Sequence, residues 1–365
     1  MIDVASAFSP SYAQARQKFL QACMAAGLRA QAHVHPLKGR DGEALAMDVA
    51  LDGAADARHL LILTSACHGV EGHCGSGVQV FALHDRDGRQ KGREAGVGVR
   101  YVHPPNPQGF SYSRRVTHEN VDLNRNFLDF AQPLPANPAY AELHELLLPP
   151  TWPPTAENQA AIDAWMAAHG IKAYQAAVTA GQYQFPDGLF FGGHAPTWSN
   201  QTFRRVLREH AQHAQGLAWI DLHTGLGPNG HGERIFACKD DKAAYARANA
   251  WWGAEHAVTS IYDGSSTSAL LNGLMWNSIY EECPKAEFTA IALEYGTLPM
   301  LEVTDALRAD HWMHKYPGKA SPELAASIRE KMLEAFYTDT DAWKGQIISQ
   351  ARQAMFQAVE GLTRA

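Results

Sequence analysis

The chain has 365 residues, of which 46% are hydrophobic, and its 31 basic and 38 acidic side chains give a net charge of −7. A chain of this length can bury a large core without disulfide or metal staples, as one large α/β domain or as two smaller ones. The mild negative charge, without a basic stripe, argues against nucleic acid or an anionic membrane as the main partner. Small polar or neutral substrates are left as candidates.

The cysteines and the N-terminal segment point to an ordinary intracellular protein. The five cysteines are odd in number and include no Cys-x-x-Cys pair, so neither a disulfide framework nor a cysteine-only zinc site is expected. The first 20 residues lack a basic segment followed by an apolar one, and no uncharged apolar run is long enough to span a membrane. We therefore expect a soluble, cytoplasmic protein.

Hydrophobic periodicity predicts strands and helices that alternate along the chain. Helices are expected over residues 11–28, 75–83, 156–169 and 240–256. Strands are expected over residues 45–51, 60–64, 97–102, 217–222, 235–238 and 288–293. The second of these is a continuous apolar run, which is typical of a strand buried on both faces. The pattern predicts an α/β fold with a mixed, mainly parallel sheet and helices on both faces.

Residues 133–154 contain seven prolines and are a possible linker. We interpret them as a surface excursion within a single domain of residues 1–365, because residues suited to chemistry lie on both sides of them. Residues 299–365 predict a helical C-terminal extension, in which Pro322 opens one helix after Ser321. The excursion and residues 182–200 are the loops expected to narrow the entrance to a site.

Two segments at strand ends contain possible metal ligands. His68 and Glu71 follow the buried strand in a glycine-rich turn, and His223 ends the strand that begins at residue 217. Open α/β sheets bind ligands outside the carboxyl ends of their strands, and catalytic zinc often takes two histidines and one glutamate. These three residues are the predicted ligands. Asp221 shares a strand face with His223 and either orients an imidazole or caps a nearby group.

Further charged residues suit hydrolytic chemistry. Glu294 ends an apolar strand, where burial raises the pKa of a carboxyl group toward that of a general base; the alternative is an acid that accepts backbone N–H bonds. Beside a metal, Arg114 or Arg115 suits the stabilisation of an oxyanion, and Asn124 with Arg125 suits the binding of a substrate carboxylate. Arginines in a polar loop otherwise form a solvated surface.

Together these segments resemble the zinc carboxypeptidase superfamily, which includes metallocarboxypeptidases, succinylglutamate desuccinylases and aspartoacylases. His68-x-x-Glu71 looks like its paired zinc ligands, and residues 106–110 look like its Asn-Pro-Asp-Gly turn. Residues 121–127 are similar to its Asp-x-Asn-Arg-Asn-aromatic signature, while the strand with His223 resembles the third-ligand strand and Glu294 falls where the catalytic glutamate is found. The resemblance spans about residues 60–297. It implies Zn²⁺ as cofactor and hydrolysis of an amide next to a free carboxylate.

The resemblance leaves the substrate open. A metallocarboxypeptidase acting on small peptides is the preferred interpretation. An N-acyl-amino-acid deacylase is the first alternative, and an inactive relative that binds metal or carboxylate is the second. Cobalt, nickel or manganese could occupy the same ligands. Arg115 is favoured over Arg114 as the oxyanion residue, the oligomeric state is undetermined, and residues 264–273 leave the side-chain preference open. The candidates for a lid tyrosine are Tyr262, Tyr280 and Tyr295.

Other patterns are weaker. The pairs His210/His213 and His311/His314 are interpreted as exposed helix histidines, because no strand-end acid lies near them in the sequence. The glycine-rich turn at residues 69–77 lacks the P-loop sequence and the dinucleotide-binding spacing. Cys67 and Cys74 are expected to be small buried apolar residues rather than nucleophiles.

Overall fold

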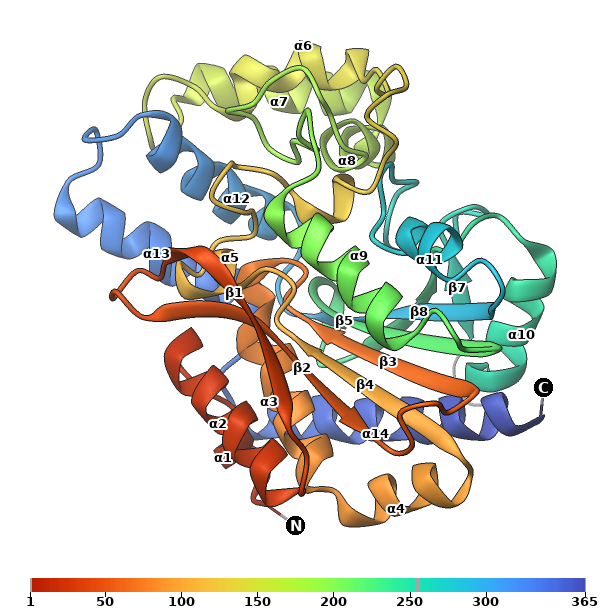
Figure 1. Cartoon of the computed structure of the whole chain (residues 1–365). Helices are drawn as coiled ribbons and strands as arrows, with labels where there is room; N and C mark the ends of the chain where they lie inside the picture. Colours follow the sequence, from red (N-terminus) through yellow and green to blue (C-terminus); the bar gives the residue numbers. More distant parts are fainter. Residues whose placement is uncertain (1, 254–256, 365) are drawn as a thin grey trace.

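A computed structural model describes residues 2–253 and 257–364 (Figure 1). Its centre is an eight-stranded sheet with the order β1-β2-β4-β3-β5-β8-β6-β7. The strands are β1 Ala30–Lys38, β2 Ala44–Asp52, β3 His59–Ser65, β4 Val97–His103, β5 Gly216–Asn229, β6 Gly232–Phe236, β7 Val258–Ser260 and β8 Glu287–Gly296.

The helices surround this sheet and carry the rest of the regular structure. Those of the first half of the chain are α1 Val4–Ala7, α2 Tyr12–Ala25, η1 Gly69–Glu71, α3 Gly72–His84, α4 Arg86–Glu94, α5 Pro107–Ser111, η2 Leu123–Arg125, α6 Pro138–Leu147, α7 Ala156–His169 and α8 Ile171–Thr179. Those of the second half are α9 Trp198–His210, α10 Lys242–Trp252, α11 Asn277–Glu282, α12 Met300–Lys315, α13 Pro322–Phe336 and α14 Asp341–Arg364.

The sheet is mixed and mainly parallel, as predicted. β3 pairs in parallel with β4 and β5, β5 with β8, and β6 with β7, whereas the pairs β1–β2, β2–β4 and β6–β8 are antiparallel. The three central strands β3, β5 and β8 are buried almost throughout, because helices cover both faces. Since these three strands are parallel, their carboxyl ends lie at the same edge of the sheet.

Side chains on β5 show which helices cover each face. Trp219 packs against Phe203 of α9, with ring centroids 5.1 Å apart, and against Trp276 before α11. Leu222, which alternates to the opposite face, lies against α3: a Cβ atom at Gly75 would lie 3.4 Å from Leu222 Cβ and only 2.7 Å from Ser65 Cβ. α3 and α14 thus cover one face and α9 the other (Figure 1).

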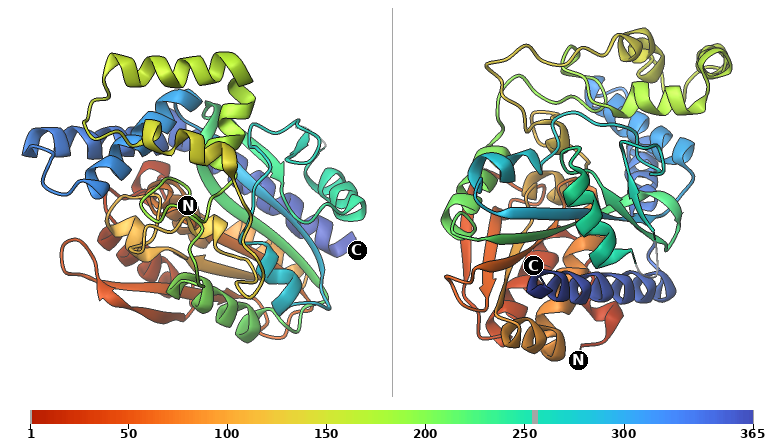
Figure 2. Two further views of the ribbon diagram at one scale, coloured as in Figure 1. Left: turned by 90° about the horizontal axis from the view of Figure 1, so that it is seen from above. Right: turned by 90° about the vertical axis from the view of Figure 1, so that its right-hand side faces the viewer.

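A second hydrophobic cluster lies apart from the sheet. It joins α6, α7 and α8 to α12 and α13 through buried side chains such as Tyr140, Leu143, Tyr174, Leu307 and Phe336. Figure 2 shows these helices gathered at one end of the molecule, with α14 at the other. The proline-rich segment 133–154 thus contains α6 and supports this second helical layer.

Most predicted elements are present, and the differences have physical causes. β1 was not predicted: residues 30–35 do alternate between apolar and polar types, but most of the strand is exposed and it contains no buried apolar run. β7 has only three residues. The helix expected over residues 240–256 is α10, Lys242–Trp252, and residues 254–256 lie outside the described residues. The prediction of exposed helix histidines is wrong for His311, which is 2% exposed, and for His210, whose side chain is 15% exposed. Within the described part of the chain, no helix is both long and apolar enough to cross a membrane.

Two buried histidines make the fold sensitive to acid. His103 of β4 stacks on Phe19 of α2 at 4.4 Å, and His311 lies within α12. Burial lowers the pKa of His103 to about 3, and burial together with Arg114 lowers that of His311 to about 4. Both imidazoles are therefore neutral in the folded chain at pH 7.

We expect the free energy of unfolding to fall as the pH drops from about 6.5 to 5. The unfolded chain binds protons at these histidines near pH 6.5, whereas the folded chain binds them only near pH 4 or below. Stability from this source is full above pH 6.5 and is lost below it, by about 2 kcal/mol per histidine at pH 5. Urea unfolding at pH 7 and 5 measures the loss. His103→Gln should reduce the loss and the exposed His213→Gln should not; equal losses in both variants would contradict the prediction.

Candidate functional site

The register of the central strands brings the predicted site residues together. On β5 and β8, His223 lies directly beside Glu294, and on β3 and β5, Thr64 lies beside Asp221. His68 follows the end of β3 by three residues. Because these strands are parallel, residues far apart in the sequence reach the same edge of the sheet.

The turn that carries His68 and Glu71 is held by close backbone packing. The backbone N–H groups of Gly69 and Val70 donate to the carbonyls of Arg115 and Arg114, at 3.1 and 2.9 Å. A Cβ atom at Gly69 would lie 2.0 Å from the carbonyl carbon of Gly109. Only glycine therefore allows this turn to approach the loop after α5 closely enough to make these bonds.

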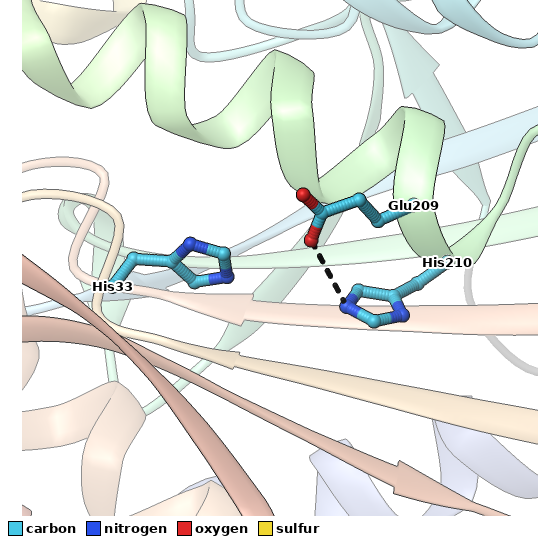
Figure 3. Close-up of side chains that lie close together, drawn as sticks. All are labelled: His33, Glu209 and His210. Carbon is cyan, nitrogen blue, oxygen red and sulfur yellow. Dashed lines mark ion pairs between the residues drawn. The ribbon is translucent and has the colours of Figure 1, made fainter.

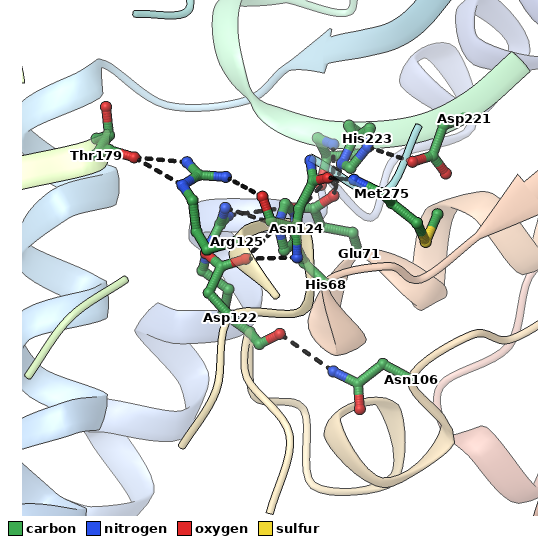
Figure 4. A network of polar contacts seen from close by, with 12 residues as sticks. His68, Glu71, Asn106, Asp122, Asn124, Arg125, Thr179, Asp221, His223 and Met275 are labelled. Atoms are coloured by element: carbon green, nitrogen blue, oxygen red, sulfur yellow. Dashed lines mark hydrogen bonds and ion pairs between the residues drawn. The ribbon is translucent and has the colours of Figure 1, made fainter. Parts of the chain in front are cut away.

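Three buried side chains converge with the geometry of a metal site (Figure 4). The Nδ1 atoms of His68 and His223 are 3.3 Å apart, and they lie 2.9 and 3.0 Å from the two carboxylate oxygens of Glu71. Zinc bound by histidine and glutamate has ligand distances near 2.0–2.2 Å, and atoms spaced about 3 Å apart surround a point at that distance. The residues present therefore fit a zinc ion.

Each histidine is oriented from behind by a carboxylate. Nε2 of His68 lies 3.2 Å from Asp122 Oδ1, and Nε2 of His223 lies 2.8 Å from Asp221 Oδ2. A proton on Nε2 of His223 leaves its Nδ1 lone pair directed into the site, which is the usual arrangement behind metal-bound histidine. Nε2 of His68 lies beside both Asp122 and a donor of Arg115. Thr64 donates to the other oxygen of Asp221 at 2.5 Å. Asp221 thus orients the imidazole, the first of the two roles considered for it.

The charges around the site are strongly coupled. Burial opposes ionisation of Asp122, but Arg115 and His68 outweigh it and hold the pKa of that carboxyl well below its usual range. Burial likewise disfavours the charged form of His223, yet Asp221 and Glu71 raise its pKa well above 6.5. The carboxylates thus stabilise a positive charge at the point where the ligand atoms meet.

The two neighbouring arginines have different environments. Arg115 donates through Nε to Asp122 at 2.9 Å, its Nη2 lies 2.8 Å from His68 Nε2, and its guanidinium faces the cavity over Phe190 at 4.9 Å. Arg114 instead donates to Asp310 of α12 at 2.8 Å and does not line the cavity among the described residues. Of the pair, only Arg115 can reach a bound substrate.

Asn124 and Arg125 lie in η2 and also line the cavity. Arg125 donates through Nε and Nη2 to the carbonyl of Thr179, at 3.0 and 2.6 Å, and through Nη1 to the carbonyl of Asn124 at 2.8 Å. Asn124 Oδ1 accepts from Met275 N at 2.9 Å. Because guanidinium has five N–H donors, one on each terminal nitrogen of Arg125 is left for a ligand.

Glu294 faces the same cavity from the end of β8. Its Oε1 accepts one hydrogen bond, from Leu226 N at 3.1 Å. Burial, and then the negative charge of Glu71, raise the pKa of Glu294 to about 8. The residue thus combines the two interpretations made from the sequence, since it accepts a backbone N–H bond and also has the raised pKa of a general base.

The cavity has a volume of about 90 Å³. Besides the site residues, its walls are mostly apolar and come from the sheet, α8, α12 and α13: Gln175, Thr179, Phe190, Thr224, Gly225, Leu226, Ile235, Ala237, Ile261, Ser268, Leu271, Leu274, Trp276, Ala292, Met300, Val303, Thr304, Leu307 and Phe336. Of the two loops expected to narrow the entrance, residues 182–200 contribute Phe190 to these walls. Residues 133–154 contribute no side chain to the walls; their helix α6 packs on α8, which does line the cavity.

Sequence reasoning missed the role of Asp122, which orients His68 and holds Arg115. Its place two residues before Asn124, in the segment that resembles a family signature, was the available signal. The hydroxyl groups of the three tyrosines considered as lids are hydrogen-bonded elsewhere. Tyr262 donates to the carbonyl of Cys238, and Tyr295 donates to the carbonyl of Ile347. Tyr280 accepts from the backbone N–H of Lys239. None of them lines the cavity in the described structure.

Residues 8–350 match the model of a family described as a protein of unknown function, DUF2817. The chain belongs to this family. None of the curated proteins matches the chain. Since the family is described as one of unknown function, membership in it does not assign an activity.

The fold of this DUF2817 chain is similar to that of solved carboxypeptidases. It is similar to carboxypeptidase A from Helicoverpa armigera, at 11% identity and a TM-score of 0.54, over 97% of this chain and 74% of that one. It is equally similar to bovine thrombin-activatable fibrinolysis inhibitor, solved with a tick carboxypeptidase inhibitor, at 10% identity, a TM-score of 0.54 and 98% of both chains. A succinylglutamate desuccinylase from Silicibacter also matches, at 14% identity and a TM-score of 0.38, over 84% of this chain and 65% of that one.

We expect Asp122→Asn to weaken zinc binding by about 10- to 100-fold, because an amide holds the imidazole of His68 in place less firmly than a carboxylate does. Competition with a chromophoric zinc chelator measures the affinity. Asp310→Asn is the matched control, since Asp310 is also buried and paired with an arginine but lies outside the cavity lining. Equal zinc affinities for the two variants would contradict the role given to Asp122.

Proposed function

We propose that this DUF2817 protein is a zinc-dependent hydrolase that cleaves the amide bond next to the free C-terminal carboxylate of a small peptide. One observation carries the proposal: a buried His-Glu-His group, the acid Glu294 and the partly unpaired guanidinium of Arg125 line the same cavity. A metal, a base and a carboxylate-binding group are the three parts that this reaction needs.

The metal has defined ligands and a defined task. His68, Glu71 and His223 would hold Zn²⁺, and the ion, when bound, supplies a Lewis acid for the scissile carbonyl and the attacking water. Asp122 and Asp221 hold the two imidazoles in the orientation that this requires.

Substrate orientation is assigned to Arg125 and Asn124, which line the same cavity as the ligands. The two unpaired N–H groups of Arg125 match the two oxygens of a carboxylate. The carbonyls of Thr179 and Asn124 fix the plane of the guanidinium, so a bound carboxylate would be held at a set position relative to the metal ligands. Asn124 lines the cavity beside it and would add a side-chain contact.

The chemical steps are assigned to two further residues. Glu294 accepts the proton of the attacking water and then delivers it to the nitrogen of the leaving amine. Arg115, which faces the cavity from beside His68, donates hydrogen bonds to the oxygen of the scissile carbonyl as negative charge develops on it.

The apolar part of the cavity favours an apolar side chain on the residue that carries the free carboxylate. Ile235 of β6 lies beside Ala292 of β8, and together with Ala237 and Ile261 they make an uncharged wall. Such a wall accepts an aliphatic or aromatic side chain and disfavours a charged one, which would lose its hydration without gaining a partner. We therefore propose that the C-terminal residue of the substrate is apolar.

The test is a substrate panel with the zinc-loaded protein. N-benzoylglycyl dipeptides ending in leucine, phenylalanine, glutamate or lysine are compared with their C-terminal amides and with N-acetyl amino acids. Cleavage of the leucine and phenylalanine peptides, but not of the amides, is the expected result. Cleavage of only the N-acetyl amino acids would replace the proposal with a deacylase. No cleavage by a zinc-replete protein would favour an inactive relative.

Glu294→Gln should lower kcat by at least about 100-fold, because the amide cannot take up the proton of the attacking water. Zinc content should stay the same, since Glu294 is not among the predicted ligands. Steady-state kinetics and metal analysis measure the two effects. The control is Glu287→Gln, at the opposite end of the same strand, where the side chain is exposed and pairs with Arg247. A similar loss of activity in both variants would argue against a specific role.

Ala237→Phe should lower kcat/KM for peptides ending in leucine or phenylalanine by at least about 10-fold, because the added ring fills the apolar wall. Peptides ending in alanine or glycine should be affected much less. Ala243→Phe, on the exposed surface of α10, is the control for adding a ring. Equal losses for large and small C-terminal residues would place the apolar wall away from the substrate side chain.

A further inference from the structure

A second group of metal-binding side chains lies between β1 and α9, outside the cavity. His33 comes from β1, and Glu209 and His210 come from the last turn of α9 (Figure 3). The alternate residues of β1 face this helix: Gln31 donates to Glu209 at 3.4 Å, and the ring of His35 lies 4.5 Å from that of Trp198. Strand and helix are thus in contact along this seam.

The three side chains are close enough to share one ion. One ligand atom from each lies within 4.8 Å of the others, and Nε2 of His210 is 3.7 Å from Glu209 Oε2. Three atoms at that largest spacing surround a point about 2.8 Å away, whereas zinc needs about 2.0–2.2 Å. Each side chain would have to move by about 0.7 Å or less, which a small rotation about its χ angles provides.

The polar atoms of this group are also incompletely satisfied. The Nε2 atoms of His33 and His210 are buried and have no hydrogen-bond partner among the described residues. A buried polar atom without a partner is energetically unfavourable, and a cation coordinated by these nitrogens would give them one.

The charges around the group are mixed. Glu209 contributes one negative charge, and the carboxyl end of α9 adds the partial negative charge of its free carbonyls. Asp48 favours a cation near His33, whereas Arg205 opposes one there and Arg100 opposes one near His210. The balance suits an ion bound through direct coordination by imidazole nitrogen and a carboxylate, rather than one attracted only by charge.

We propose that His33, Glu209 and His210 bind a second zinc ion, which ties β1 to α9 and is independent of the ion proposed for the cavity. β1 is the edge strand of the sheet and is paired only with β2. A zinc ion at this seam would add a tether between two elements that are far apart in the sequence. Its role is structural, and its effect would be a thermal stability that depends on zinc.

The test is the zinc content of the purified chain after equilibration with micromolar free zinc. Wild type should hold two equivalents, His68→Ala one, and His33→Ala and His210→Ala one each. His213→Ala is the matched control, because His213 follows the same helix but is exposed and outside the group, and it should retain two. Zinc contents of His33→Ala and His210→Ala equal to that of wild type would overturn the proposal. A single equivalent in wild type that survives His68→Ala but is lost in His33→Ala would support it and overturn only the ion proposed for the cavity.

A second measurement separates metal binding from misfolding. In the His68→Ala background, added zinc should raise Tm, and His33→Gln in the same background should abolish that rise while the zinc-free Tm is kept. Circular dichroism checks that each variant is folded. An equal rise of Tm with and without His33→Gln would show that zinc stabilises the chain elsewhere and would overturn the proposal.

Discussion

Four carboxylates lie buried around one cavity, and the surrounding structure depends on their stabilisation. Glu71, Asp122, Asp221 and Glu294 are all at most 9% exposed. Removing a carboxylate from water costs several kcal/mol unless cations or N–H donors replace the lost hydration. The histidines and Arg115 supply them to the first three, whereas Glu294 has one backbone donor and a pKa raised to about 8. A divalent cation would offset the same cost, so folding and metal affinity are linked.

The backbone that holds these groups is rigid for reasons that lie outside the site. The turn after β3 is bonded to the loop after α5, and Gly69 allows their close approach. The buried pair of Arg114 and Asp310 then connects that loop to α12, which forms another wall of the cavity. The two adjacent arginines therefore have different contacts: Arg115 faces the cavity, and Arg114 connects the loop after α5 to α12 in the second helical layer. This division follows from the opposite directions of their side chains.

Prediction from the sequence succeeded where a local pattern sufficed. The strands at residues 60–64, 217–222 and 288–293 were found because strands buried on both faces are continuous apolar runs. The members of the buried His-Glu-His group were singled out because they end or follow such runs. β1 was missed because its residues are mostly exposed, and the burial of His311 was missed because α12 is covered by α13. The role of Asp122 was missed because it acts through a histidine that is distant in the sequence.

The sequence by itself determined which parts are present: the mixed α/β fold, the His-Glu-His group and the acid at the end of β8. Each of these depends on a run of apolar residues and on what ends it, which are local properties. Only the tertiary structure decided that Arg115 faces the cavity, that carbonyls clamp Arg125, that the wall beyond the ligands is apolar, and that His33 meets His210. These depend on contacts between segments that are distant in the sequence or on the direction of single side chains, and no local periodicity encodes either.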